Sequence, residues 1–112
     1  MGIAPINYGS DVMPTTAKAL FRGAAATSNT TLYTVPASTT AVVNTIVVVN
    51  SAATNATYTL TLDDVPLGTT VVVPANDSAI LEIKQALATA KTIKGFASAI
   101  TVAFHISGIE IS

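Results

Sequence analysis

The sequence predicts an all-β fold: a single β-sandwich of about eight short strands, with either a jelly-roll or an immunoglobulin-like topology. Stretches rich in Val, Ile, Thr and aromatic residues recur at about ten-residue spacing, which is typical of sandwiches and barrels. Pro, Gly, Asn and Asp separate these stretches as turn residues. In residues 57–62 the side chains of Tyr58, Leu60 and Leu62 alternate with threonines, which predicts a strand with one face on a core.

The chain divides into an extended N-terminal arm, residues 1–19, and a sandwich domain, residues 20–112. Pro5, Gly9 and Pro14 interrupt any periodicity in the arm. Its scattered apolar side chains predict that it docks on a neighbouring subunit, and a floppy terminus is the alternative. The residues that we expect to make this contact are Ile3, Ile6, Tyr8, Val12 and Met13.

The domain is expected to contain strands at residues 19–22, 31–35, 40–50, 57–62, 69–73, 78–83, 92–98 and 100–111. A short piece at residues 65–67 precedes the fifth of them. The continuous Val and Ile of residues 40–50 predict a strand covered on both faces, or one passing from core to interface. Residues 85–90 (QALATA) are expected to form a loop or a single helical turn. Gly95 predicts a bulge, and Gly108 a kink in the last strand.

Charge is sparse in this chain. Only 10% of its 112 residues are charged, where about 25% is usual for a soluble domain. Half of the residues are hydrophobic and none is cysteine. Because surface charge keeps small monomers soluble, we expect much of this surface to be buried against other subunits or a partner. The alternative is a soluble monomer covered with Thr, Ser, Asn and Ala.

The same composition excludes several kinds of partner. A net charge of −1 gives no overall electrostatic footprint for nucleic acid. The longest apolar run, residues 46–49, is far shorter than the ~20 residues that span a bilayer. The first residues lack the basic and apolar regions of a secretory signal. Neither nucleic acid nor membrane is therefore an expected partner.

No motif for catalysis, cofactor binding or metal binding is present. The single histidine, His105, lies on the strand face opposite Phe104 and is expected to be a surface or interface residue. Asp63 and Asp64 are adjacent, so on a strand they would point to opposite faces. A solvated turn is expected there, with a weak calcium site as the alternative. The chain is therefore not expected to be an enzyme.

Three lysines, Lys84, Lys91 and Lys94, form a modest basic cluster. Ordinary solvated charge is the expectation, and contact with a phosphate or an acidic partner is the alternative. Tyr33 and Tyr58 are the candidates for an aromatic platform in a receptor- or carbohydrate-binding module. Tyr58 is expected in the core, which weakens that hypothesis.

Three segments resemble small virion structural proteins of tailed bacteriophages. They are LYTVPASTTAVVNTIVVVN at residues 32–50, VPANDSAILEI at 73–83 and GFASAITVAFHISGIEI at 95–111. The resemblance covers about residues 30–112 and consists of strands and turns, not of an active-site motif. Ser38 departs from it, because the family would have Gly at that turn.

The resemblance implies a β-sandwich virion protein. The leading expectation is a capsid decoration, or cement, protein on the outer surface of the head, made in the cytoplasm of the host bacterium. Its partner would be the major capsid protein, and it would form a homo-oligomer, for which a trimer is expected. A tail, neck or fibre-associated virion protein is the alternative. The family has no catalytic residues to carry over.

Overall fold

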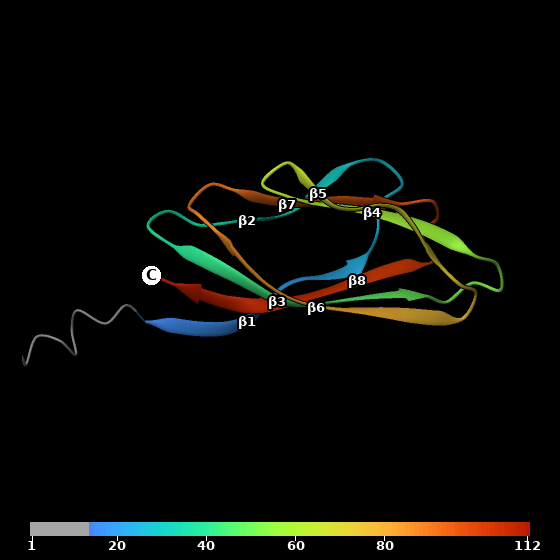
Figure 1. Ribbon diagram of the computed structural model, residues 1–112, viewed down its shortest axis with the longest axis horizontal. Helices are drawn as coiled ribbons and strands as arrows, with labels where there is room; N and C mark the ends of the chain where they lie inside the picture. The colour runs from blue at the N-terminus through green and yellow to red at the C-terminus, as the bar shows by residue number, and fades with distance from the viewer. Residues whose placement is uncertain (1–13) are drawn as a thin grey trace, which may run out of the picture.

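The computed structural model describes residues 14–112, which form eight β-strands and no helix. Two four-stranded antiparallel sheets pack face to face (Figure 1). The predicted single β-sandwich is therefore confirmed. Its strands are β1 (Thr15–Ala24), β2 (Thr30–Thr34), β3 (Thr40–Asn50), β4 (Ala56–Leu62), β5 (Val65–Val73), β6 (Asp77–Leu87), β7 (Thr92–Ala97) and β8 (Val102–Ile111).

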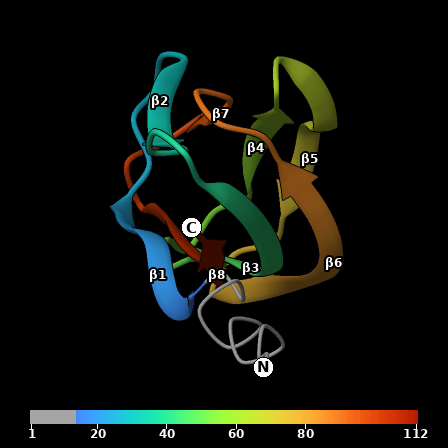
Figure 2. The same ribbon diagram turned by 90° about the vertical axis from the view of Figure 1, so that its left-hand side faces the viewer.

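The strand order decides between the two expected topologies. One sheet has the order β1-β8-β3-β6 and the other has the order β2-β7-β4-β5. Strand β1 pairs with β8, β2 with β7, β3 with β6 and β4 with β5. The chain is therefore arranged as one long hairpin folded over on itself. This nesting is the jelly-roll arrangement. It leaves β1 and β2 on one side of the sandwich and β5 and β6 on the other (Figure 2).

The core lies between the two inner faces. β4 alternates buried and half-buried side chains, as its sequence predicts, and β7 and β8 do the same. Phe104, Ile46 and Leu60 are among the largest fully buried side chains. The Tyr58 ring meets Phe104 edge to face, with ring centroids 6.2 Å apart, which is a favourable aromatic geometry. Tyr58 is thus a core residue, as expected.

The first strand begins earlier than the sequence predicts. Residues 15–19, assigned above to the arm, pair with β8 as part of β1. All five side chains are exposed, so they carry no alternating apolar pattern to reveal a strand. Backbone hydrogen bonding to β8 holds this part of β1, and that pairing has no signature in the sequence.

Two other boundaries differ from expectation for a related reason. Residues 85–87 extend β6 and are not a loop or helical turn, because Gln85, Ala86 and Leu87 pair with β3. Cross-strand pairing here overrides the helix propensity of Gln, Ala and Leu. Residues 65–67 and 69–73 form one strand, β5, with a register shift against β4 between Leu60 and Tyr58.

Gly95 and Gly108 both lie where neighbouring strands pack closely. The register of β7 with β4 runs through Gly95 without a shift, and a Cβ atom there would lie 2.6 Å from Leu60 Cδ2. A Cβ atom at Gly108 would collide with the carbonyl oxygen of Val42 on β3. Near Gly95 the extra residue is Leu32 of β2, which interrupts the register with β7. Near Gly108 it is Asn44 of β3, which interrupts the register with β8.

Candidate functional site

All five residues predicted to make the arm contact precede Pro14. They therefore lie outside the residues that the structure describes. The arm contact stays a prediction. The remaining candidate residues all fall within the described part of the chain.

The candidate catalytic and metal-binding side chains are not brought together. The cross-strand neighbours of His105 are Arg22 on β1 and Val47 on β3, and neither of them is an acid or a nucleophile. Within residues 14–112, no three His, Asp or Glu side chains are grouped so that they could hold a metal ion. The same residues contain no helix long and apolar enough to cross a membrane.

Asp63 and Asp64 form the two-residue turn between β4 and β5. Both have positive φ, 54° and 61°, which is the backbone of the tight hairpin turn that Asp tolerates. Their carboxylates pair with Lys91 at 3.5 Å and with Lys94 at 3.1 Å. Exposed pairs of this kind contribute only about 0–1 kcal/mol each to stability. Lys84, the third lysine of the predicted cluster, has no ion pair among residues 14–112.

Neither candidate tyrosine provides an exposed aromatic platform. Tyr58 is 3% exposed. The half-buried Tyr33 donates a hydrogen bond from its hydroxyl to Glu110, and Lys18 pairs with the same carboxylate at 3.3 Å. The hydrogen bond from Tyr33 holds the pKa of Glu110 below its ordinary value, and Lys18 adds to the effect. These three residues act as a link between the two sheets.

The most unusual surface is the side of the sandwich formed by β5 and β6. Both strands lie at a sheet edge, so each has one side without a neighbouring strand among residues 14–112. This side carries most of the large exposed hydrophobic side chains in the described residues, namely Val65, Leu67, Val71, Val72 and Ile80. An apolar edge of this kind is a favoured site for contact with another chain.

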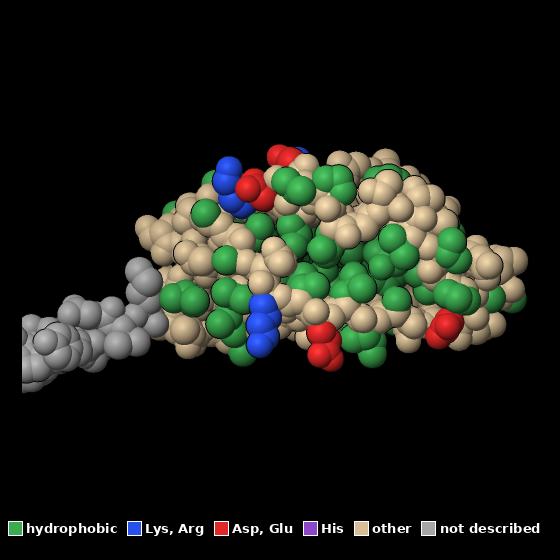
Figure 3. Space-filling view, viewed as in Figure 1, with side chains coloured by type: hydrophobic (Ala, Val, Ile, Leu, Met, Phe, Trp, Pro, Cys, Tyr) green, Lys and Arg blue, Asp and Glu red, His purple; other side chains and the backbone are tan. Residues whose placement is uncertain are grey.

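The inner face is also incompletely covered along this side. Leu81 and Ile83 of β6 pack against the core but remain half-buried. A small hollow of about 110 Å³ lies between the start of β5 and the end of β6, lined by Leu62, Val65, Pro66, Leu67 and Gln85. Figure 3 shows a band of hydrophobic side chains between the two sheets on this side of the molecule. The core is therefore open to solvent along the β5/β6 edge.

The two edge strands differ in how well they could pair with another strand. β5 contains Pro66 and carries Thr70 with φ 49°, beside its register shift. Proline and irregular backbone are devices that protect an edge strand from pairing. β6 has no proline and extends over eleven residues, with one register shift against β3 where Ile83 and Lys84 lie opposite Asn44. Its side chains at Glu82 and Lys84 point outward, while Ile83 points inward.

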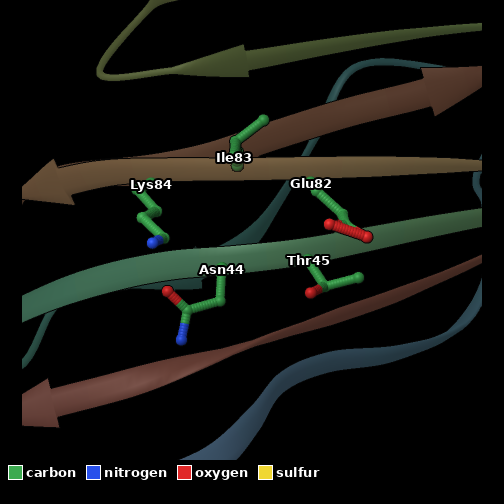
Figure 4. Close-up of a pocket in the computed structure, with 5 residues that line it drawn as sticks. All are labelled: Asn44, Thr45, Glu82, Ile83 and Lys84. Carbon is green, nitrogen blue, oxygen red and sulfur yellow. The ribbon is translucent and has the colours of Figure 1, made fainter.

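Beside β6, the bulge in β3 leaves a shallow hollow of about 470 Å³ on the outer face of the sheet. Asn44 and Thr45 project to the same side there, together with Glu82 and Lys84 (Figure 4). These four polar side chains lie on an open surface. Both charged side chains of the hollow belong to the edge strand β6.

Comparison of the chain with models of protein families, with curated protein sequences and with solved structures found no match. The β5/β6 edge is therefore identified as a candidate contact surface from the structure of this chain alone. Sequence reasoning missed it because Val71, Val72 and Val73 are typical of a buried strand. The low charge of the chain predicted a contact surface, and only the strand order gives its position.

Proposed function

We propose that the chain is a structural protein of a bacteriophage virion, a decoration or cement protein that binds the outside of the head and stabilises it. The observation that carries the proposal is the open β5/β6 edge. Exposed Val65, Val72 and Ile80 stand on a domain in which only 10% of all residues are charged. Such a surface suits a protein that works packed against other subunits.

Two further points support this proposal. The three segments that resemble phage virion proteins correspond to β2–β3, the start of β6 with the turn before it, and β7–β8, so the resemblance involves both sheets. The jelly roll is also the architecture of many viral capsid domains, although a fold by itself does not fix a function. In this role the major capsid protein is the partner, and binding to it adds stability by mass action.

The test is the copy number of this protein in purified virions of the phage that encodes it. Quantitative mass spectrometry would measure its ratio to the major capsid protein. A ratio near one, or a simple fraction of one, is the expected result for a protein on the head lattice. Absence from the particle would overturn the proposal.

A tail, neck or fibre-associated protein is the second candidate. It shares the fold and the apolar contact surface, and it differs in copy number. A few copies per particle would favour it over the decoration role. Cryo-electron microscopy of the same virions would then locate the density on the tail, whereas the leading proposal places it on the head.

A further inference from the structure

The β6 strand has a charge pattern that complements itself. Glu82 and Lys84 lie on the outer face, with the inward-facing Ile83 between them. Neither charge takes part in an ion pair among residues 14–112. Both stand beside the free side of an edge strand. A second β6 strand paired along this edge would bring its own Glu82 and Lys84 beside these charges.

Symmetry restricts the possible registers. A two-fold axis perpendicular to the sheet pairs two β6 strands antiparallel and keeps outer face beside outer face. Even-numbered positions must then face even-numbered positions, because side chains alternate along the strand. The axis must therefore lie midway between the two copies of one residue, which face each other across the new strand pair. Each choice of central residue fixes every cross-strand pair.

Among the registers with the axis at residue 81, 82, 83 or 84, only one places both charged side chains opposite a side chain of the other sign. An axis at Ile83 sets Glu82 of each copy opposite Lys84 of the other, which gives two opposite-charge pairs. An axis at Glu82 or at Lys84 places like charges opposite each other, which is unfavourable in a sheet. An axis at Leu81 leaves both charges facing uncharged residues. The charges thus select the register centred on Ile83.

We propose that two copies of this chain associate through their β6 strands, antiparallel and centred on Ile83, to form a continuous eight-stranded sheet. In this register Ile80 faces Ala86 and Leu81 faces Gln85 of the other copy. The half-buried Leu81 and Ile83 and one flank of the exposed Ile80 side chain would lose part of their contact with water.

The rest of this side of the molecule fits such a contact. β5 lies on the same side of the sandwich as β6 (Figure 2). Its exposed Val65, Val71 and Val72 would approach the second copy. Pro66 gives β5 one position without an amide hydrogen, whereas β6 contains no proline, so β6 is the strand that makes the new hydrogen bonds. The association is a property of the purified chain and does not rest on the proposed role in a virion.

A charge-swap series tests the register. Glu82→Lys and Lys84→Glu each turn both attractive pairs into repulsive ones, and the double variant restores attraction with the signs exchanged. Sedimentation equilibrium of the full chain should show a dimer for the wild type. Each single variant should raise the dissociation constant about ten-fold or more, and the double variant should return it close to wild type. Arg22→Glu, on the opposite edge, is the matched control and should leave it unchanged.

Cross-linking tests the same register by distance. Facing Cα atoms in an antiparallel pair are about 4.5–5.5 Å apart, which is within disulfide range. The chain has no cysteine, so Ile83→Cys introduces one thiol at the axis. Oxidation should give a covalent dimer. Ile80→Cys is the control, because its two thiols would be about 20 Å apart along the strands.

Three results would contradict the proposed β6–β6 dimer. A wild type that stays monomeric across the micromolar range overturns the proposal. So does a dimer or trimer whose dissociation constant ignores the charge swap, because its contact lies elsewhere. Equal cross-linking at positions 80 and 83 excludes this register. Circular dichroism of each variant verifies the fold, and the substituted charges are exposed, so the fold should be retained.

Discussion

Tyr33 donates a hydrogen bond from its hydroxyl to Glu110 Oε2 at 2.5 Å, and this bond joins β2 of one sheet to β8 of the other. Burial, the hydrogen bond and the negative charge of Glu110 together raise the pKa of the Tyr33 hydroxyl. The pKa of Glu110 is lowered, first by Tyr33 and then by Lys18, against an opposing effect of burial. The folded state thus favours an ionised Glu110 beside a neutral Tyr33.

This link predicts a loss of stability in acid. Because its folded-state pKa is below its unfolded value, Glu110 stabilises the fold above the unfolded pKa, and this contribution disappears as the pH falls through the folded-state pKa. Glu110→Gln should lower the free energy of unfolding at pH 7 by about 1–2 kcal/mol. The difference from wild type should shrink below pH of about 4.3, the ordinary pKa of Glu. Urea unfolding at several pH values measures it.

The control for this experiment is Arg22→Gln, which replaces an exposed charged residue of β1 that has no ion pair among residues 14–112. It should change stability by less than about 0.5 kcal/mol at pH 7. Tyr33→Phe removes the strongest partner of Glu110 and should reproduce the pH trend. A Glu110→Gln effect that is the same at pH 7 and pH 3 would contradict the role assigned to the carboxylate.

Gly108 is predicted to be intolerant of any side chain. A Cβ atom there would collide with the backbone oxygen of Val42 and lie 3.1 Å from Leu20 Cδ1. Because backbone in a paired strand cannot shift freely, Gly108→Ala should cost about 3 kcal/mol or more. Gly23→Ala is the control, since its Cβ atom would lie 3.5 Å from Phe21, an ordinary contact. Thermal unfolding of both variants compares them, and equal melting temperatures would refute the prediction.

Ser38 is predicted to be a site where glycine increases stability. Its φ is 55°, in the left-handed region that costs a non-glycine residue about 1–2 kcal/mol. Glycine removes this cost, but the greater freedom of the unfolded chain at a glycine offsets roughly 0.5–1 kcal/mol of the stability gained. Ser38→Gly should therefore raise the free energy of unfolding by about 0.5–1 kcal/mol. Ser78→Gly, within β6, should lower it instead. Destabilisation by both variants would be evidence against strain at residue 38.

The Ser38 turn also shows what a sequence can reveal. The turn was expected where glycine would be usual, and the positive φ is the physical reason for that preference. The alternation of residues 57–62 likewise predicted β4 and the buried position of Tyr58. The glycine preference at residue 38 was implied by the resemblance to phage virion proteins, whereas the alternation of residues 57–62 is local and can be read from neighbouring residues.

Long-range pairing decided the features that could not be predicted. Residues 85–87 have the composition of a helical turn, and pairing with β3 makes them part of a strand. Val71, Val72 and Val73 are typical of a central strand, and the jelly-roll order places them at an edge. The candidate contact surface is a consequence of that order. Its position therefore depends on which strands are neighbours and cannot be read from β5 or β6 separately.

Asn50 is predicted to be the polar residue on which one end of the sandwich depends. It is 1% exposed, and its side-chain nitrogen donates to the carbonyl oxygens of Thr54 and Val73 while its oxygen accepts from the Ala52 amide. Asn50→Ala would leave these buried groups unpaired and should cost about 2–4 kcal/mol. Asn44→Ala, on an exposed bulge of the same strand, should cost less than about 0.5 kcal/mol. Chemical denaturation of the two variants tests the difference.

The start of β1 sets where the arm can be removed in a test of the proposed function. Pro14 still accepts a hydrogen bond from the Ser112 amide, and Thr15 pairs with Ile111. A deletion of residues 1–13 therefore keeps every described strand, whereas a deletion through residue 19 would remove half of β1. The shorter deletion should leave the unfolding temperature unchanged.

If the arm holds the capsid, the same deletion should abolish co-sedimentation with head shells assembled without this protein. Replacing Ile3 and Ile6 by Ser should weaken binding about ten-fold or more, because two apolar side chains would lose their burial. Asn7→Ala is the matched control within the arm and should bind normally. A folded deletion variant that binds head shells as tightly as wild type would exclude the arm as the capsid contact.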